Sequence, residues 1–157
     1  MTAEVIAGHD VLLVPVDPDR VDDVLGGELD GRTAGPGWPH ADTAPALAFA
    51  IGGGLTWLIV DGDDRVVGEL GTKTAPDGSG RVEIGYGLAA SSRRRGLGTH
   101  AVAALVGWLG GQPDVAIVQA RVDPTNEPSV RLLRRLGFTC VSRARGEDVY
   151  ELTAPPP

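Results

Sequence analysis

The chain has 157 residues, of which 42% are hydrophobic and 22% charged, a composition typical of one globular domain with a substantial core. No apolar run approaches the roughly 18 residues that a membrane span needs, and the first residues lack the basic and then apolar order of a signal peptide, so we expect a cytoplasmic protein with no membrane partner. Cys140 is the only cysteine, which excludes an internal disulfide.

The formal net charge of −7 is unevenly distributed along the chain. Residues 1–92 carry 15 acidic and 5 basic side chains, a net charge of −10, whereas residues 93–157 carry 6 acidic and 9 basic side chains, a net charge of +3. The basic part fits an anionic cofactor and the acidic part a cationic ligand such as an amine or a basic peptide, although ordinary solubilising charge explains the same numbers. Nucleic acid is not an expected partner, because the chain as a whole is acidic.

A strand and a short helix are the first predicted elements. The apolar, β-branched run 11–16 predicts a strand, and Asp17 followed by proline is typical of a helix start, with apolar residues at helical spacing over 21–25. Residues 30–45 are rich in glycine and proline and predict a loop or a broken pair of helices. A short apolar helix follows over 46–51.

Two side chains stand out within the glycine- and proline-rich loop. Trp38 and His40 are an indole and an imidazole in a segment of mostly small and polar residues, which indicates a use in packing or in recognition. The alternative is that Trp38 packs on the edge of the core and His40 is solvated.

Three strands in a meander come next. Gly85 and Gly87 lie inside the third of them and predict a bulge or a close approach by a ligand. The strands are expected over 56–60, 66–72 and 81–88, with turns at 61–64 and 75–80.

The stretch from Leu88 to Thr99 leads from this last strand directly into a helix. Arg93 to Arg95 precede Gly96 and Gly98, and two close glycines at a helix start leave backbone N–H groups and aligned dipoles free to attract a pyrophosphate. The stretch does not fit the Walker loop, which needs a lysine, or the dinucleotide fingerprint, which needs a third glycine where Ala101 stands.

The C-terminal part predicts a crossover, a second helix and a hairpin. Gly137 is the expected residue after the end of the second helix. The elements are expected as a helix over 99–109, a strand over 115–122 that runs parallel to 81–88, a helix with Val130, Leu133 and Leu136 on one face, and strands over 138–143 and 148–152.

Three motifs resemble the GNAT acyltransferase family, in particular the branch with the ribosomal-protein N-terminal acetyltransferases. They are Arg93-x-x-Gly96-x-Gly98, Glu83-Ile84-Gly85-Tyr86, and Asp123-Pro124-x-Asn126-x-x-Ser129 continuing through Leu132, Leu133 and Leu136 to Gly137-Phe138. The resemblance implies an α/β (α+β) fold: a mixed, mostly antiparallel sheet flanked by helices, whose fourth and fifth strands splay apart around pantetheine. One domain would span 1–157, with its core over 11–152.

The resemblance also implies acetyl-CoA as cosubstrate, without a metal. Leu88 and Ala90 would offer backbone groups to pantetheine, and Asn126 would hydrogen-bond the same arm. The pyrophosphate would be held mainly by the amides of Arg93, Arg94, Arg95, Gly96, Leu97, Gly98 and Thr99. For the arginine side chains, simple solvated charge is the alternative to a phosphate contact.

The implied reaction is attack of an amine on the acetyl thioester, for which Glu83 is the candidate base, directly or through water. A surface carboxylate is the alternative for Glu83. Many members of the family carry a tyrosine acid seven residues after the asparagine, where this chain has Leu133. Ser129 would protonate or orient the thiolate instead, or would only satisfy a backbone donor at the helix start.

Three functions fit these motifs. The first is an N-acetyltransferase that acts on a small amine or a peptide N-terminus, with Trp38, His40 and the hairpin around 146–148 at the acceptor pocket. The second is an acyl-CoA sensor without activity, and the third is an interaction module on the same fold. An exposed final hairpin could also support a homodimer.

Overall fold

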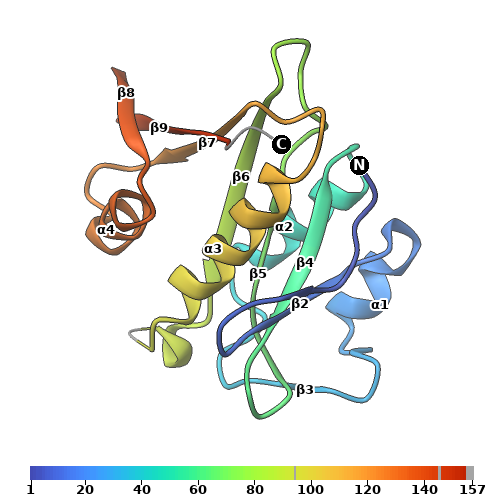
Figure 1. Cartoon of the computed structure of the whole chain (residues 1–157). Coiled ribbons are helices and arrows are strands. Elements are labelled where there is room, and N and C mark those ends of the chain that lie inside the picture. The colour runs from blue at the N-terminus through green and yellow to red at the C-terminus, as the bar shows by residue number, and fades with distance from the viewer. Residues whose placement is uncertain (94, 145, 155–157) are drawn as a thin grey trace.

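The computed structural model describes residues 1–93, 95–144 and 146–154, and within them the strands form one mostly antiparallel sheet (Figure 1). The strands are β1 (Ile6–Ala7), β2 (Leu12–Pro15), β3 (Thr33–Ala34), β4 (Leu55–Val60), β5 (Arg65–Thr72), β6 (Arg81–Leu88), β7 (Ile117–Val122), β8 (Thr139–Ala144) and β9 (Glu147–Thr153). Their order across the sheet is β1-β2-β4-β5-β6-β7-β9-β8, and β3 pairs with β5. The helices are α1 (Val21–Leu25), α2 (Thr43–Leu47), α3 (Leu97–Gly110) and α4 (Glu127–Arg135), with 3₁₀ turns at Pro18–Arg20, Ala48–Ala50 and Ala90–Ser92.

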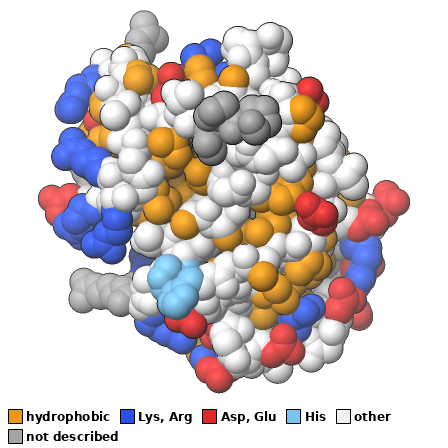
Figure 2. All heavy atoms as spheres, viewed as in Figure 1, with side chains coloured by type: hydrophobic (Ala, Val, Ile, Leu, Met, Phe, Trp, Pro, Cys, Tyr) orange, Lys and Arg blue, Asp and Glu red, His pale blue; other side chains and the backbone are white. Residues whose placement is uncertain are grey.

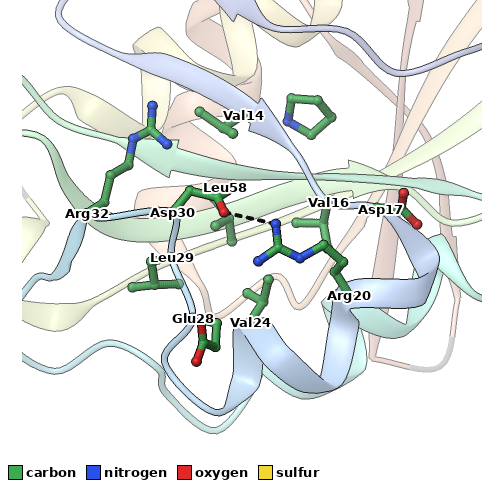
Figure 3. Close-up of a pocket in the computed structure, with 11 residues that line it drawn as sticks. Val14, Val16, Asp17, Arg20, Val24, Glu28, Leu29, Asp30, Arg32 and Leu58 are labelled. Atoms are coloured by element: carbon green, nitrogen blue, oxygen red, sulfur yellow. Dashed lines mark hydrogen bonds and ion pairs between the residues drawn. The ribbon is translucent and has the colours of Figure 1, made fainter.

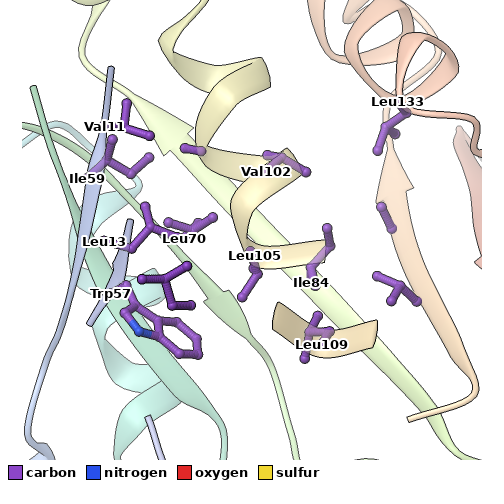
Figure 4. Packing of buried hydrophobic residues seen from close by; sticks show 14 of the residues in the cluster. Val11, Leu13, Trp57, Ile59, Leu70, Ile84, Val102, Leu105, Leu109 and Leu133 are labelled. Carbon is purple, nitrogen blue, oxygen red and sulfur yellow. The ribbon is translucent and has the colours of Figure 1, made fainter. Parts of the chain in front are cut away.

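The helices cover both faces of the sheet. On one face, the apolar stripe of α3 packs on strand residues such as Trp57, Leu70 and Ile84 (Figure 4). On the other face, α1 and α2 bury Val24 and Leu47 in a second cluster. Within the described residues, no helix is long and apolar enough to cross a membrane. Successive side chains along a strand point to opposite faces of the sheet, so the strands contribute apolar residues to two separate cores.

The chain ends α4 with the predicted glycine. Gly137 has a φ of +93° and follows the last helical turn. Its N–H donates to the Arg134 carbonyl at 3.0 Å, and the Phe138 N–H donates to the Leu133 carbonyl at 3.0 Å. These two bonds satisfy carbonyls that the helix leaves open, so the chain can turn directly into β8.

The fourth and fifth expected strands, over 81–88 and 115–122, are β6 and β7 of the structure, and they splay apart as the motifs implied. β6 and β7 run parallel, and they pair only from Arg81–Ile84 to Ile117–Ala120. The remaining residues 85–88 of β6 are paired with β5 alone, and the end of β7 is paired with β9. The sheet is therefore open between the second half of β6 and β7, which confirms the fold expected from the motifs.

Several expected boundaries differ from the structure. β1 was not predicted, because two residues carry no readable period, and β7 begins at Ile117 rather than at residue 115. Helix α2 begins at Thr43, three residues before the expected start, because Pro45 still lies in the first helical turn, where proline is tolerated. β6 pairs with β5 in continuous register across Gly85 and Gly87, so the expected bulge is wrong at these glycines.

Candidate functional site

The loop between β6 and α3 presents the start of a helix at the open side of the sheet. Gly96 has a φ of +75° and precedes the first residue of α3, Leu97. The first hydrogen bond of the helix runs from the His100 N–H to the Gly96 carbonyl at 3.0 Å. The amides of Leu97, Gly98 and Thr99 lie before this bond, in the turn whose N–H groups have no partner in the helix. This geometry can bind an anion through the backbone.

The side chains of the loop have different surroundings. Arg93 is exposed, and its Nε donates to the Leu88 carbonyl at 3.3 Å. Arg95 Nη1 lies 3.8 Å from Oδ2 of Asp61. The Leu97 side chain is buried in the core, which leaves only its backbone for a ligand. Ala90 is exposed in the preceding turn. Arg94 lies outside the described residues.

Asp61 is a buried counterpart of the arginines at this end of the sheet. Burial raises the pKa of Asp61, but hydrogen bonds from the backbone N–H groups of Arg65 and Asp63, together with the Arg65 charge, hold it below its usual value. The carboxylate is therefore charged at neutral pH. It lies 3.8 Å from Nη1 of Arg95 and so links β4 to the loop.

Asn126 and Ser129 lie at the start of α4, across the opening from β6. The side-chain oxygen of Asn126 accepts a hydrogen bond from the Ser129 N–H at 3.3 Å and caps the helix. The amide nitrogen of that side chain does not take part in this cap and can donate to a pantetheine arm. The Ser129 hydroxyl is hydrogen-bonded to the phenol of Tyr86 on β6, so the two hydroxyls connect β6 and α4.

Tyr86 was seen in the sequence only as part of a strand and a motif. Burial raises the pKa of its phenol, against the opposite effect of the hydrogen bond with Ser129. The phenol therefore stays protonated at neutral pH and can give a proton. Leu133, at the place of the family's tyrosine acid, is fully buried in the core and offers no such group.

Glu83 is a paired carboxylate on β6. Lys73 Nζ donates to its Oε1 at 2.8 Å, and Arg121 Nε lies 3.4 Å from the same oxygen. The side chain is 23% exposed. It precedes Gly85 by two residues and shares its face of the strand, so it lies next to the opening, and its role stays a prediction.

Trp38 and His40 converge on a residue that the sequence analysis missed, Glu69 of β5. Trp38 Nε1 donates to Glu69 Oε1 at 3.1 Å, and Nε2 of His40 lies 3.1 Å from Oε2. Thr43 Oγ1 donates to Oε1 at 2.7 Å. Trp38 is buried in the second core, and His40 is 18% exposed, paired rather than solvated. The signal in the sequence was a single acidic residue within an apolar strand, Val66 to Thr72.

A pocket of about 170 Å³ lies beside this carboxylate. The phenyl ring of Phe49 covers Gly85, where an added Cβ would lie 3.2 Å from its Cε2 atom. The residues that line the pocket are Asp42, Pro45, Ala46, Phe49, Glu69, Gly85 and Tyr86. Trp38 and His40 reach it through Glu69, and the hairpin around 146–148 is not among these lining residues.

A smaller hollow of about 70 Å³ lies beside α1 and is separate from this site (Figure 3). Arg20 Nη1 donates to Asp30 Oδ1 at 2.9 Å across it, and Val24, Leu29 and Leu58 form its apolar floor. None of the residues that line it belongs to the β6–α3 loop or to α4. The ion pair between Arg20 and Asp30 thus pairs the charges of two lining residues with each other.

The surface reflects the uneven charge of the sequence. Figure 2 shows Lys and Arg side chains gathered on the side of α4 and β8, whereas Asp and Glu side chains are frequent on the opposite side. Among the described residues, His9, Asp10 and His100 also come together, with potential metal-ligating atoms within 4.8 Å of one another. Their side chains belong to the β1–β2 turn and to α3, and none of them lines the pocket next to Glu69.

Comparisons with known proteins agree with this geometry. The family model of the acetyltransferase (GNAT) domain matches residues 11–139. The uncharacterized N-acetyltransferase YjdG of Bacillus subtilis (strain 168) is 31% identical over 124 residues, which are 73% of this chain and 71% of that protein. The RimL ribosomal L7/L12 alpha-N-protein acetyltransferase in complex with coenzyme A has a TM-score of 0.70 at 18% identity, over 96% of this chain and 98% of that one. Mycobacterium smegmatis RimJ in complex with CoA-disulfide also has a TM-score of 0.70, at 20% identity over 96% and 88%.

Proposed function

The chain belongs to the GNAT acetyltransferase family, and from this premise we propose that it transfers the acetyl group of acetyl-CoA to a primary amine. The observation that carries the proposal is the opening between β6 and β7, which leads to the first turn of α3. Pantetheine would lie along the unpaired edge of residues 85–88, and the pyrophosphate on the amides of 96–99. The RimL and RimJ structures of the same fold are complexes with coenzyme A and with CoA-disulfide, which supports a site for this cosubstrate.

The loop side chains would add charge to this cradle. Arg93 and Arg95 are exposed beside the helix start; the Arg93 Nε donates to the Leu88 carbonyl at 3.3 Å, and Arg95 Nη1 lies 3.8 Å from Asp61 Oδ2. A guanidinium in this position can exchange such a partner for a phosphate oxygen, which is a stronger, charge-assisted bond. Asn126 would donate to the pantetheine arm through its amide nitrogen.

The reaction needs a neutral amine, a stabilised oxyanion and a proton for the thiolate. The amine nitrogen forms a bond to the acetyl carbon as the carbon–sulfur bond breaks; the amine loses one proton and the thiolate gains one. Glu83, directly or through water, would accept the first proton, with Lys73 and Arg121 holding its carboxylate in place. The linked hydroxyls of Tyr86 and Ser129 would supply the second, because the buried phenol is protonated at neutral pH.

A second function is favoured by one observation. Leu133 is buried at the position where many members of the family carry the tyrosine acid. If Tyr86 and Ser129 do not replace that acid, the chain would bind acyl-CoA without transferring the acetyl group. It would then act as a sensor rather than an enzyme.

One experiment separates the two functions. Acetyl-CoA is titrated into the protein by calorimetry, and CoA release is then followed in the same preparation with a panel of amines and basic peptides. Saturable binding with acceptor-dependent release supports the acetyltransferase. Binding without release across the panel supports the sensor, and no binding refutes the cofactor site on which both depend.

A further inference from the structure

Two histidines and an aspartate meet where the turn between β1 and β2 lies against the start of α3. His9 and Asp10 belong to that turn, and His100 belongs to the first turn of the helix. One potential ligand atom of each side chain lies within 4.8 Å of the other two. Figure 2 shows a patch of histidine side chains on the surface of the molecule. The two segments are far apart in the sequence, so only the folded chain brings these three groups together.

Close packing holds the turn on the helix. A Cβ atom at Gly8 would lie 3.0 Å from the Cβ atom of Ala104 and 3.5 Å from the carbonyl oxygen of His100, so the backbone of the turn lies directly on α3. The Gly8 N–H donates to the Val11 carbonyl at 2.9 Å and closes the turn. At this level the rings of His9 and His100 meet edge-on, with their centroids 4.6 Å apart.

The turn places the side chains of His9 and Asp10 on one side, although the two residues are neighbours in the sequence. In an extended strand such neighbours point to opposite faces. Asp10 instead has a φ of +58°, in the left-handed region, and its Oδ2 lies 3.4 Å from Nε2 of His9. Both side chains are largely exposed, at 76% and 69%, so an ion from solvent can reach them. An exposed pair of this kind contributes little stability by itself.

The third side chain, His100, has an unpaired ring nitrogen. The residue is half-buried, and its Nδ1 is a buried atom with no hydrogen-bond partner among the described residues. Buried polar atoms are nearly always paired, so the surroundings of this ring lack a partner. Because no hydrogen bond at Nδ1 fixes the tautomer, the neutral ring can present the lone pair of either nitrogen. The nitrogen within 4.8 Å of the ligand atoms of His9 and Asp10 is therefore free to bind a metal ion.

The donor set of two imidazoles and one carboxylate indicates which ion fits. Zn²⁺ binds histidine nitrogen and carboxylate oxygen, commonly with three protein ligands and a water molecule in a tetrahedral arrangement. Ligand atoms around such an ion are roughly 3.4 Å apart, so the set must close by about 1 Å, which rotation of the exposed His9 and Asp10 side chains allows. Mg²⁺ and Ca²⁺ prefer oxygen ligands throughout and do not match two imidazoles.

We propose that His9, Asp10 and His100 bind one divalent transition-metal ion, for which Zn²⁺ is the best match. The ion ties the β1–β2 turn to the first turn of α3. A Cβ atom at Gly96 would lie 3.6 Å from Cε1 of His100, so the ion braces the helix start that carries the amides of the proposed pyrophosphate site. None of the three ligands lines the pocket next to Glu69 or acts in the proposed acetyl transfer, so the metal site is independent of the proposed function.

Calorimetric titration with Zn²⁺ and with Mg²⁺ tests the site in the metal-free wild type, His9→Ala, Asp10→Asn and Asp114→Asn. Asparagine also tolerates the left-handed region, so Asp10→Asn removes the charge and keeps the turn. Asp114 is exposed in the turn before β7 and serves as the matched charge control. We expect the wild type and Asp114→Asn to bind one Zn²⁺ per chain and to show no saturable binding of Mg²⁺. His9→Ala and Asp10→Asn should bind Zn²⁺ at least about tenfold more weakly, because loss of even a group that only supports a ligand weakens metal affinity by about 10- to 100-fold.

A second measurement needs the wild type alone. The chain has three histidines, and His40 contacts Glu69 next to α2, so its ring is an internal control in the NMR spectrum. Paramagnetic Co²⁺ below one equivalent should broaden the ring signals of His9 and His100 and leave those of His40 sharp. The proposal is overturned if the wild type shows no saturable Zn²⁺ binding, or if either His9→Ala or Asp10→Asn binds Zn²⁺ as the wild type does. Equal broadening of all three histidines also overturns it, because the ion would then have no defined site.

Discussion

Replacing Gly98 by alanine should strengthen the fold and weaken acetyl-CoA binding at the same time. Gly98 is the second residue of α3, and its φ lies outside the left-handed region. An added Cβ would meet Leu132 Cδ1 at 3.5 Å, an ordinary contact. The same methyl group would take up space beside the amides of 96–99, where the pyrophosphate is proposed to lie. The two effects have opposite signs and are measured separately.

Gly107 provides the matched control. It lies later in α3, is exposed, and has no atom within 4 Å of an added Cβ. Alanine at either site reduces the freedom of the unfolded chain and should stabilise the protein by about 0.4–1 kcal/mol. For a chain of this length, that corresponds to a rise in Tm of about 1–4 °C. Gly107→Ala should leave acetyl-CoA binding unchanged.

The expected loss of acetyl-CoA affinity in Gly98→Ala follows from the amide–phosphate hydrogen bonds that the methyl group would disturb. A hydrogen bond to a charged group contributes about 1.5–3 kcal/mol, so the loss of one amide–phosphate bond weakens binding by about tenfold or more. Thermal unfolding and calorimetric titration of both variants measure the two quantities. If Gly98→Ala binds acetyl-CoA as tightly as Gly107→Ala, the proposed pyrophosphate site is wrong.

Three further changes test other parts of the account. Glu83→Gln should lower turnover and leave acetyl-CoA affinity nearly unchanged, and an unaltered rate would remove Glu83 from the mechanism. The raised pKa of Tyr86 means that the folded state holds this proton more tightly than the unfolded state, so stability falls as pH rises above about 10. Urea unfolding should show a smaller alkaline loss for Tyr86→Phe, and equal losses would contradict the effect of burial. Leu133→Ala should cost about 2–5 kcal/mol in urea unfolding because its side chain is fully buried, and a cost near zero would show that the core there collapses freely.

The sequence was informative where local chemistry determines the backbone. The Asp-Gly turn after β4 closes with a hydrogen bond from the Asp61 N–H to the Arg65 carbonyl at 2.9 Å, and Gly137 ends α4 as expected. The parallel crossover followed from the length of the connection between β6 and β7. Turn residues and helix-terminating residues determine the backbone conformation of only a few neighbouring positions, so such elements can be predicted from a single sequence.

The site around Glu69 could not be predicted in the same way. Its partners Trp38 and Thr43 are 31 and 26 positions away, and the face it occupies depends on a bulge in β5 at Val67. Gly87 was expected to admit a ligand or a bulge, and the groups that approach it are Glu69 and His40. Contacts between segments that are distant in sequence, and a shift of one residue in strand register, produce no periodic pattern of hydrophobic residues, so they could not be predicted from the sequence.

Hydrogen exchange with and without acetyl-CoA tests the central claim most directly, because the proposed site consists of backbone amides. The account predicts that acetyl-CoA slows exchange over 96–99 and along the unpaired edge over 85–88, while the β8–β9 hairpin is unchanged. Saturating acetyl-CoA that leaves the exchange of both segments unaltered would contradict it.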